Sequence, residues 1–152
     1  MLSWLAKRVL SHNLARNNAG DIRATLRLEH PDVVFRFPGQ NSWGGEFRGR
    51  DQVRLWLERL VDAGLQMELD EVVATGWPWR ATVSLRGRDH LHGAGGELVY
   101  ENRFVIWGHL RWGRLVGYEV YEDTEKSAAL DVWLSENRPD LRLAPTPAVA
   151  AG

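Results

Sequence analysis

The sequence contains no cysteine. This absence excludes disulfide bonds, thiol nucleophiles and thiolate metal sites, so any chemistry must come from oxygen and nitrogen groups. No apolar run approaches the roughly 18 residues of a membrane-spanning helix. The first ten residues, MLSWLAKRVL, are interrupted by Lys7 and Arg8 before any secretory cleavage pattern appears. We therefore expect a cytoplasmic protein with no membrane partner.

A dominant charge is also missing. The 19 Lys and Arg residues nearly balance 20 Asp and Glu residues, for a formal net charge of -1. Such a chain has no overall attraction for phosphate backbones, so we expect no nucleic-acid partner. What is present is typical of one soluble globular domain: 152 residues, of which 44% are hydrophobic and 26% charged. The eight tryptophans suit a core, a cavity or an interface.

Hydrophobic periodicity predicts an α+β chain. Apolar spacings of three and four predict helices over 1–18, from Asp21 to Glu29, from Asp51 and from Asp123, the last with a buried stripe of Ala128, Ala129, Val132 and Trp133. Alternating patterns predict strands over 32–37, 65–75, 79–88, 98–107 and 115–121. Short connections favour an antiparallel meander, with helices collected on one face of a curved antiparallel sheet.

The predicted domain covers residues 1–135, and the Pro/Ala-rich tail over 136–152 is expected to have little regular structure. A sheet curled over helices encloses a cone-shaped space. We expect this space to be an apolar, aromatic-rich cavity for a small hydrophobic molecule, with no metal or other cofactor.

Five short motifs occur in order along the chain: NAGDI at 18–22, HPDVVF at 30–35, FRGRDQV at 47–53, WGRL at 112–115 and YEDT at 121–124. They resemble the SnoaL-like and ketosteroid-isomerase-like branch of the nuclear transport factor 2-like superfamily. The resemblance implies a cone-shaped α+β roll of the cystatin-like kind and a habit of dimerisation. It implies no single activity, because the branch includes isomerases, dehydratases, polyketide cyclases, epoxide hydrolases and non-catalytic modules.

The acid and base positions of that branch are not retained. The position of the isomerase base holds Phe37, the position of the oxyanion-binding tyrosine holds Ser11, and the stretch 102–107 has no carboxylic acid. The last-strand carboxylate of epoxide hydrolases and SnoaL-type cyclases is replaced by Val120. An epoxide hydrolase would also need an Asp where Thr82 stands, two residues after Arg80. The mechanisms known in the branch therefore do not carry over.

Strand alternation and the resemblance together indicate which side chains face the cavity. The expected lining and binding residues are Phe35, Phe37, Tyr100, Asn102, Phe104, Tyr118 and Val120. Glu122 shares the inward face, where burial would raise the pKa of its carboxyl toward the working pH of a general acid or base. The alternative is a rim carboxylate that is solvated or paired with an arginine.

Two further features leave alternatives open. Trp43 lies in a loop over 38–47 that predicts either a lid over an apolar ligand or a turn with Trp43 capping the core. His90 and His92 share one face of a strand end near Asp89 and Glu97, but a zinc site needs a third protein ligand fixed by the fold. We do not expect a metal there.

Two hypotheses for function follow. One is a cofactor-free isomerase, dehydratase or cyclase in which Glu122 transfers a proton while Tyr100, Tyr118 and Asn102 orient a substrate oxygen. The other is a non-catalytic ligand-binding or dimerisation module. Trp107 and Tyr121 share the outer sheet face with Glu101, Arg103 and Glu119, and this face is expected to form a homodimer interface.

Overall fold

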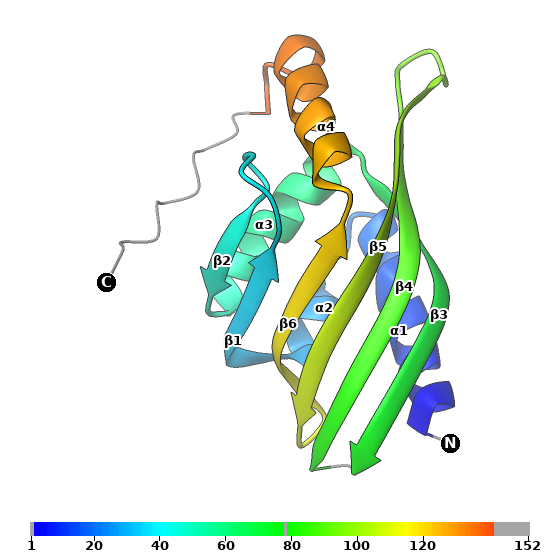
Figure 1. The fold of residues 1–152 in the computed structure, drawn as a ribbon, viewed down its shortest axis with the longest axis vertical. Helices are drawn as coiled ribbons and strands as arrows, with labels where there is room; N and C mark the ends of the chain where they lie inside the picture. Colours follow the sequence, from blue (N-terminus) through cyan, green and yellow to red (C-terminus); the bar gives the residue numbers. More distant parts are fainter. Residues whose placement is uncertain (1, 78, 142–152) are drawn as a thin grey trace.

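The computed structural model describes residues 2–77 and 79–141 (Figure 1). Its helices are α1 (Leu2–Asn18), α2 (Arg23–Leu28), α3 (Arg50–Ala63) and α4 (Thr124–Asn137). Its strands are β1 (Glu29–Phe37), β2 (Gly45–Arg48), β3 (Gln66–Trp77), β4 (Arg80–His92), β5 (Leu98–Arg111) and β6 (Arg114–Glu122). The α+β order is the expected one, with helices at the start of the chain and a meander in its second half.

The strands form one six-stranded sheet in the order β2-β1-β6-β5-β4-β3. Strands β3 to β6 are the antiparallel meander that the short connections predicted. The sheet as a whole is mixed, however, because β1 and β6 run parallel. A wholly antiparallel sheet was the wrong expectation: the chain leaves β1 through β2, α3 and the far strands, then returns along β6 in the direction of β1.

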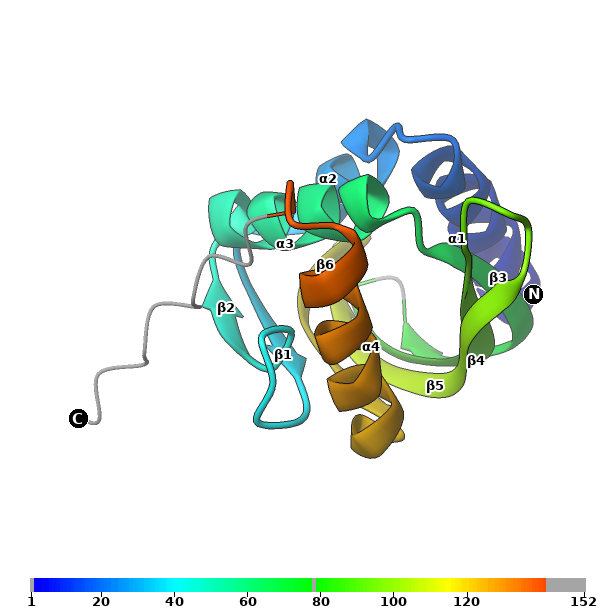
Figure 2. The same ribbon diagram turned by 90° about the horizontal axis from the view of Figure 1, so that it is seen from above.

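The sheet is bent, and α1, α2 and α3 lie on its concave side (Figure 2). A shift in the β3–β4 register between Leu69 and Glu71 marks an irregularity that bends β3. Gly87 lies opposite this point, and a Cβ there would come within 2.2 Å of the Glu68 carbonyl oxygen and 2.8 Å of the Phe104 ring. Only glycine allows the β3 backbone and the Phe104 ring to approach β4 this closely. Gly87 therefore lets the sheet curl inward.

The first strand and the helix before it differ from the prediction in their bounds. Strand β1 begins at Glu29 rather than residue 32, and its pairing with β6 is interrupted between Glu29 and Val34. Pro31, which lacks an N–H to donate, lies within that interruption. Asp21 is not the cap of α2, which is Ile22; its carboxylate instead bonds the guanidinium groups of Arg16 and Arg23.

Helix α4 begins where expected, because the Asp123 carboxylate accepts hydrogen bonds from the backbone N–H groups of Glu125 and Lys126. The predicted buried stripe was wrong for three of its four residues; Trp133 is partly buried and packs against the core. The buried residues are Ser127, Leu130 and Leu134, whereas Val132 is 59% exposed. Small and apolar residues occur all around this part of α4. Their spacing therefore did not show which face of the helix packs against the loop after β1.

The end of α4 also differs from the expected tail boundary. The helix continues to Asn137 and thus enters the stretch 136–152 that was expected to be irregular. Leu141 then packs against the core. The remainder of the predicted tail, 142–152, lies outside the described residues.

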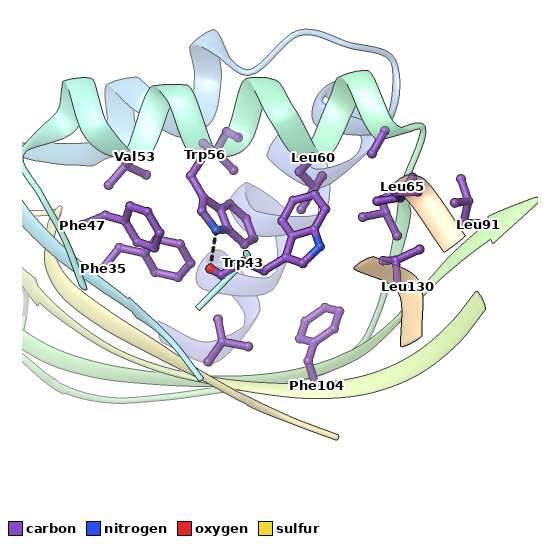
Figure 3. Packing of buried hydrophobic residues seen from close by; sticks show 14 of the residues in the cluster. Phe35, Trp43, Phe47, Val53, Trp56, Leu60, Leu65, Leu91, Phe104 and Leu130 are labelled. Carbon is purple, nitrogen blue, oxygen red and sulfur yellow. Dashed lines mark hydrogen bonds between the residues drawn. The ribbon is translucent and has the colours of Figure 1, made fainter. Parts of the chain in front are cut away.

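The core is aromatic and lies between α3 and the concave face of the sheet (Figure 3). Val53, Trp56 and Leu60 point from α3 toward the sheet, as the i, i+3, i+7 spacing requires. The Phe35 ring lies 4.6 Å from that of Tyr118 and 4.9 Å from that of Trp56, between centroids. These contacts hold β1, β6 and α3 together around one end of a cavity.

Candidate functional site

A cavity of about 160 Å³ lies between the helices and the concave sheet face. Most of the side chains around it are apolar, and they come from all four helices and five of the strands. An apolar cavity of about 150 Å³ is large enough to hold a benzene ring. The space therefore suits a ligand with at least one ring and little charge.

The structure places nearly all of the expected binding residues on this cavity. The lining includes Phe35, Phe37, Trp43, Tyr100, Phe104, Tyr118, Val120 and Glu122. Asn102 does not line it. The Asn102 amide lies behind Tyr100, donating to the Tyr100 hydroxyl at 3.1 Å and to the Asp123 carbonyl at 3.0 Å. Asn102 thus holds the end of β5 to the start of α4 and fixes the tyrosine, while the ligand side of Tyr100 remains on the cavity.

Two carboxyl groups share one end of the cavity. Glu122, near the end of β6, is opposite Phe104 in the sheet register, and Asp89 is opposite Asn102. The Tyr100 hydroxyl donates to Asp89 Oδ2 at 3.3 Å. Asp89 Oδ1 and Glu122 Oε1 are buried and have no protein hydrogen-bond partner. Strand alternation brings both groups inward, so two acids meet above an apolar floor.

Burial governs the ionisation of this pair. The pKa of Glu122 is raised to about 8, first by burial and then by the negative charge of Asp89, while hydrogen bonding with Ser127 acts in the opposite direction. Burial also raises the pKa of Asp89, to about 6, against the lowering effect of the Tyr100 hydrogen bond. Near neutral pH the two groups thus hold one proton between them, mainly on Glu122.

A second carboxyl–tyrosine pair lies toward the other end of the cavity. Glu29, at the start of β1, is fully buried, and its Oε1 accepts a hydrogen bond from the Tyr118 hydroxyl at 2.8 Å. Its Oε2 has no protein partner. Burial raises the pKa of Glu29 to about 7, although the Tyr118 bond and the Arg50 charge lower it. Tyr118 and Glu122 are four residues apart on β6, so the pairs are separated along the strand by roughly 13 Å of backbone.

Both inward tyrosines therefore bond to a carboxyl group of the protein. The expectation was that their hydroxyls would meet a ligand oxygen directly. In the structure, Tyr100 positions Asp89 and Tyr118 positions Glu29. The groups left to meet a ligand are the carboxyls themselves.

Trp43 is buried, not a surface flap. It is 2% exposed, and its carbonyl oxygen accepts the Trp56 indole N–H at 3.0 Å (Figure 3). The Arg59 guanidinium lies 4.0 Å from its ring centroid and also donates to the Ser42 carbonyl at 2.6 Å. This supports the alternative in which Trp43 caps the core. Trp43 also lines the cavity, and its own indole nitrogen is buried without a hydrogen-bond partner in the protein.

The histidine pair does not form a metal centre with its neighbours. The His90 and His92 ring centroids are 5.2 Å apart. Asp89 cannot join them as a ligand, because its side chain points to the opposite, buried face of β4. Within residues 2–77 and 79–141, no three His, Asp or Glu side chains gather in an arrangement that could hold a metal ion.

Sequence reasoning missed Asp89 and Glu29 as site residues. Strand alternation through His90 could have placed Asp89 inward, opposite the histidines. No local pattern could have found Glu29, because it follows directly on the helical stretch and its inward direction depends on pairing with Leu115 of β6. The strand β2, within the predicted loop, was also missed because only four residues form it.

A bent, six-stranded mixed sheet packed on N-terminal helices is the fold of nuclear transport factor 2-like α+β proteins. A SnoaL-like domain model matches residues 12–118, so the chain belongs to the SnoaL-like domain family. This confirms the family and the fold that the five motifs indicated. No functionally curated protein matches the chain.

Solved structures share the fold at low sequence identity. An NTF2-like protein of unknown function from Burkholderia pseudomallei is 21% identical, with a TM-score of 0.68 over 82% of this chain and 95% of that one. TerC, co-crystallised with polyporic acid, is 21% identical, with a TM-score of 0.61 over 86% of this chain and 95% of that one. A protein provisionally described as a polyketide cyclase from Pseudomonas putida is 19% identical, with a TM-score of 0.56 over 79% and 92%.

Proposed function

We propose that this protein binds a small, mainly apolar, carbonyl-containing molecule and moves a proton on it without a cofactor. One observation carries the proposal. Asp89 and Glu122 both line the cavity, and each has a buried carboxyl oxygen, Oδ1 and Oε1 respectively, without a hydrogen-bond partner in the protein. Native proteins rarely leave such groups unpaired, so a ligand or water is the natural partner.

The two carboxyls suit opposite roles. Asp89, with the lower pKa and a fixed Tyr100 partner, is ionised near neutral pH and serves as the general base at a carbon next to a carbonyl. Glu122, with the higher pKa, is protonated and donates its proton to the carbonyl oxygen. The product of this step is an enol, which an isomerase, a dehydratase or a cyclase would then use in different ways.

The proposal extends the expectation that placed Glu122 as the only proton-transfer group. A cyclase acting on an aromatic, oxygen-rich substrate is the preferred form, because the fold neighbours include a provisionally described polyketide cyclase and a protein crystallised with polyporic acid. The alternative remains a non-catalytic binding module. In that case the protonated acids only hydrogen-bond a ligand oxygen.

The first experiment is a thermal-shift screen against steroids, polyketide-like aromatics, terpenoid epoxides and fatty acids. A compound that gives a saturable upward shift is then incubated with the protein in D₂O. Proton transfer next to the carbonyl appears in NMR spectra as deuterium incorporation, whatever the final product is.

We expect Glu122→Gln and Asp89→Asn to bind that compound but to lower deuterium incorporation by roughly 10²-fold or more, the usual contribution of a general acid or base. Glu101→Gln, an exposed change on β5, is the matched control and should exchange like the wild type. Binding without exchange in the wild type would support the non-catalytic module, and no binding by any class would overturn the proposal.

A further inference from the structure

Four exposed tryptophans lie at one end of the molecule, at the opposite end of the sheet from Asp89 and Glu122. Trp77 and Trp79 flank the β3–β4 turn, Trp112 is in the β5–β6 turn, and Trp4 is in the first turn of α1. Their exposed fractions are 66%, 50%, 81% and 62%. We call these four residues the tryptophan end.

Contacts between elements bring the four together. The backbone N–H of Trp112 donates to the Trp79 carbonyl at 3.4 Å, so the two turns adjoin. The Trp77 and Trp79 rings are stacked, with centroids 5.4 Å apart. The Ser3 hydroxyl donates to the Ala74 carbonyl at 3.1 Å, which places the start of α1 beside the end of β3. Both turns project at one end of the longest axis (Figure 1).

The three segments that form the tryptophan end carry cations and no acid of their own, and the exposed acid next to them is Asp32 of the adjoining strand β1. The sequence stretches 1–20, 72–88 and 102–118 contain no Asp or Glu. They contribute exposed cations at this end: Lys7, Arg8, Arg80, Arg111 and Arg114. The net charge of -1 therefore conceals a local excess of cations in these three segments.

Apolar exposure continues along the first helix. Leu5 is 51% exposed and Val9 38% exposed, on the same stretch of α1 as Trp4 and its neighbour Arg8. Indole rings combined with Lys and Arg on projecting turns are typical of the boundary between water and lipid, where the ring enters the headgroup layer and the cation meets phosphate. Two projecting turns can bury only a small area against a rigid partner protein. A deformable lipid surface can surround them and bury more of their apolar area.

We propose that the tryptophan end docks reversibly on an anionic lipid surface. The indoles of Trp77, Trp79 and Trp112 enter the headgroup layer, and the surrounding Lys and Arg side chains contact the lipid phosphates. The contact is peripheral: no helix among the described residues is long and apolar enough to cross a membrane. Composition predicted no membrane partner because it averages the cations here with acids elsewhere. The inference is independent of the chemistry proposed for the cavity.

Vesicle co-sedimentation of the purified full chain tests it. We expect binding to phosphatidylcholine vesicles that contain phosphatidylglycerol, little binding to phosphatidylcholine alone, and weakening by salt. Trp112→Asn keeps a residue that accepts the positive φ of 51° and should lower partitioning about tenfold. Arg80→Gln/Arg111→Gln should abolish the preference for the anionic lipid.

Matched controls separate the surface from general effects. Leu98→Ser removes an apolar side chain that is 54% exposed at the opposite end of β5, and Arg48→Gln/Arg54→Gln removes the same charge elsewhere. Both should bind like the wild type. Thermal unfolding checks that each variant is folded. Absence of binding to anionic vesicles, or equal losses in the controls, overturns the proposal. Self-association or nucleic-acid binding that Trp112→Asn abolishes, without vesicle binding, also overturns it.

Discussion

Three buried carboxyl groups set the character of this domain at the level of residues. Glu29, Asp89 and Glu122 all border an otherwise apolar cavity, and burial raises the pKa of each. Burying an acid in this way costs stability once it ionises. All three carboxyl groups keep one oxygen free of protein partners, and this arrangement is what supports the proposal of a ligand in the cavity.

The cost predicts a pH dependence to which Glu29, whose side chain is fully buried, should contribute a measurable part. Its pKa is about 7 in the folded chain against an ordinary value of 4.5. Between these values the unfolded chain binds fewer protons, so the free energy of unfolding falls as pH rises through this window. Glu29→Gln keeps an oxygen that can accept the Tyr118 hydrogen bond. The free energy of unfolding of this variant should therefore fall less as pH rises.

Urea denaturation at several pH values between 4.5 and 8 measures it. The free-energy difference between Glu29→Gln and the wild type should move in favour of the variant as pH increases. Part of the slope should persist, because Asp89 and Glu122 also release protons in this range. Glu101→Gln, an exposed change, should run parallel to the wild type. Parallel curves for Glu29→Gln would mean that Glu29 is not a buried acid.

At the scale of elements, the connection from β6 to α4 links the cavity to the helix that borders it. Asp123 caps α4 with its carboxylate, while its carbonyl oxygen accepts the Asn102 amide. Glu122 comes immediately before it. The start of α4 therefore fixes where Glu122 enters the cavity, so the helix cap serves the site as well as the helix.

Asp123→Ala should lower the free energy of unfolding by about 1 kcal/mol, the usual cost of losing an N-cap side chain. Asp123→Asn retains an oxygen that can accept the bonds from the Glu125 and Lys126 N–H groups, and should lose much less. Urea denaturation at neutral pH compares them. An equal loss in both variants would indicate that the negative charge, rather than the cap bond, stabilises α4.

Elements with strong local patterns were predictable from the sequence, and elements that depend on distant partners were not. Helix α1, the α3 stripe and the meander from β3 to β6 follow from periodicity and short turns, although Leu5 and Val9 of the apolar α1 pattern are exposed. The parallel pairing of β1 with β6 joins residues about eighty apart, as in Phe35 with Tyr118, and no local pattern encodes it. The same reasoning holds in the site: Tyr100, Phe104 and Val120 followed from alternation, whereas Glu29 required that pairing.

At the scale of the whole molecule, no helix within residues 2–77 and 79–141 covers the outer, convex face of the sheet (Figure 2). The register places Val73, Ser84, Trp107 and Glu119 in one row across β3 to β6. Trp107 is 44% exposed and Tyr121, in the next row, is 54% exposed. The exposed Val73, Val105 and Trp107 give this face an apolar centre, and ion pairs such as Arg86 with Glu71, at 3.1 Å, flank it. An apolar centre within a charged rim is the usual anatomy of a homodimer interface.

We propose that two copies pair through this outer face, leaving both cavities and both tryptophan ends free. Size-exclusion chromatography with light scattering should give twice the mass of 17.3 kDa. Trp107→Lys should give a monomer, because a two-fold axis places two buried ammonium groups near each other. Leu55→Lys, at a 59% exposed position on α3, should remain a dimer.

A wild type that is monomeric at every soluble concentration, or a dimer that Trp107→Lys leaves intact, would contradict this interface. Because the two cavities stay intact in the monomer, ligand binding by Trp107→Lys should match the wild type, which separates assembly from the function of the site.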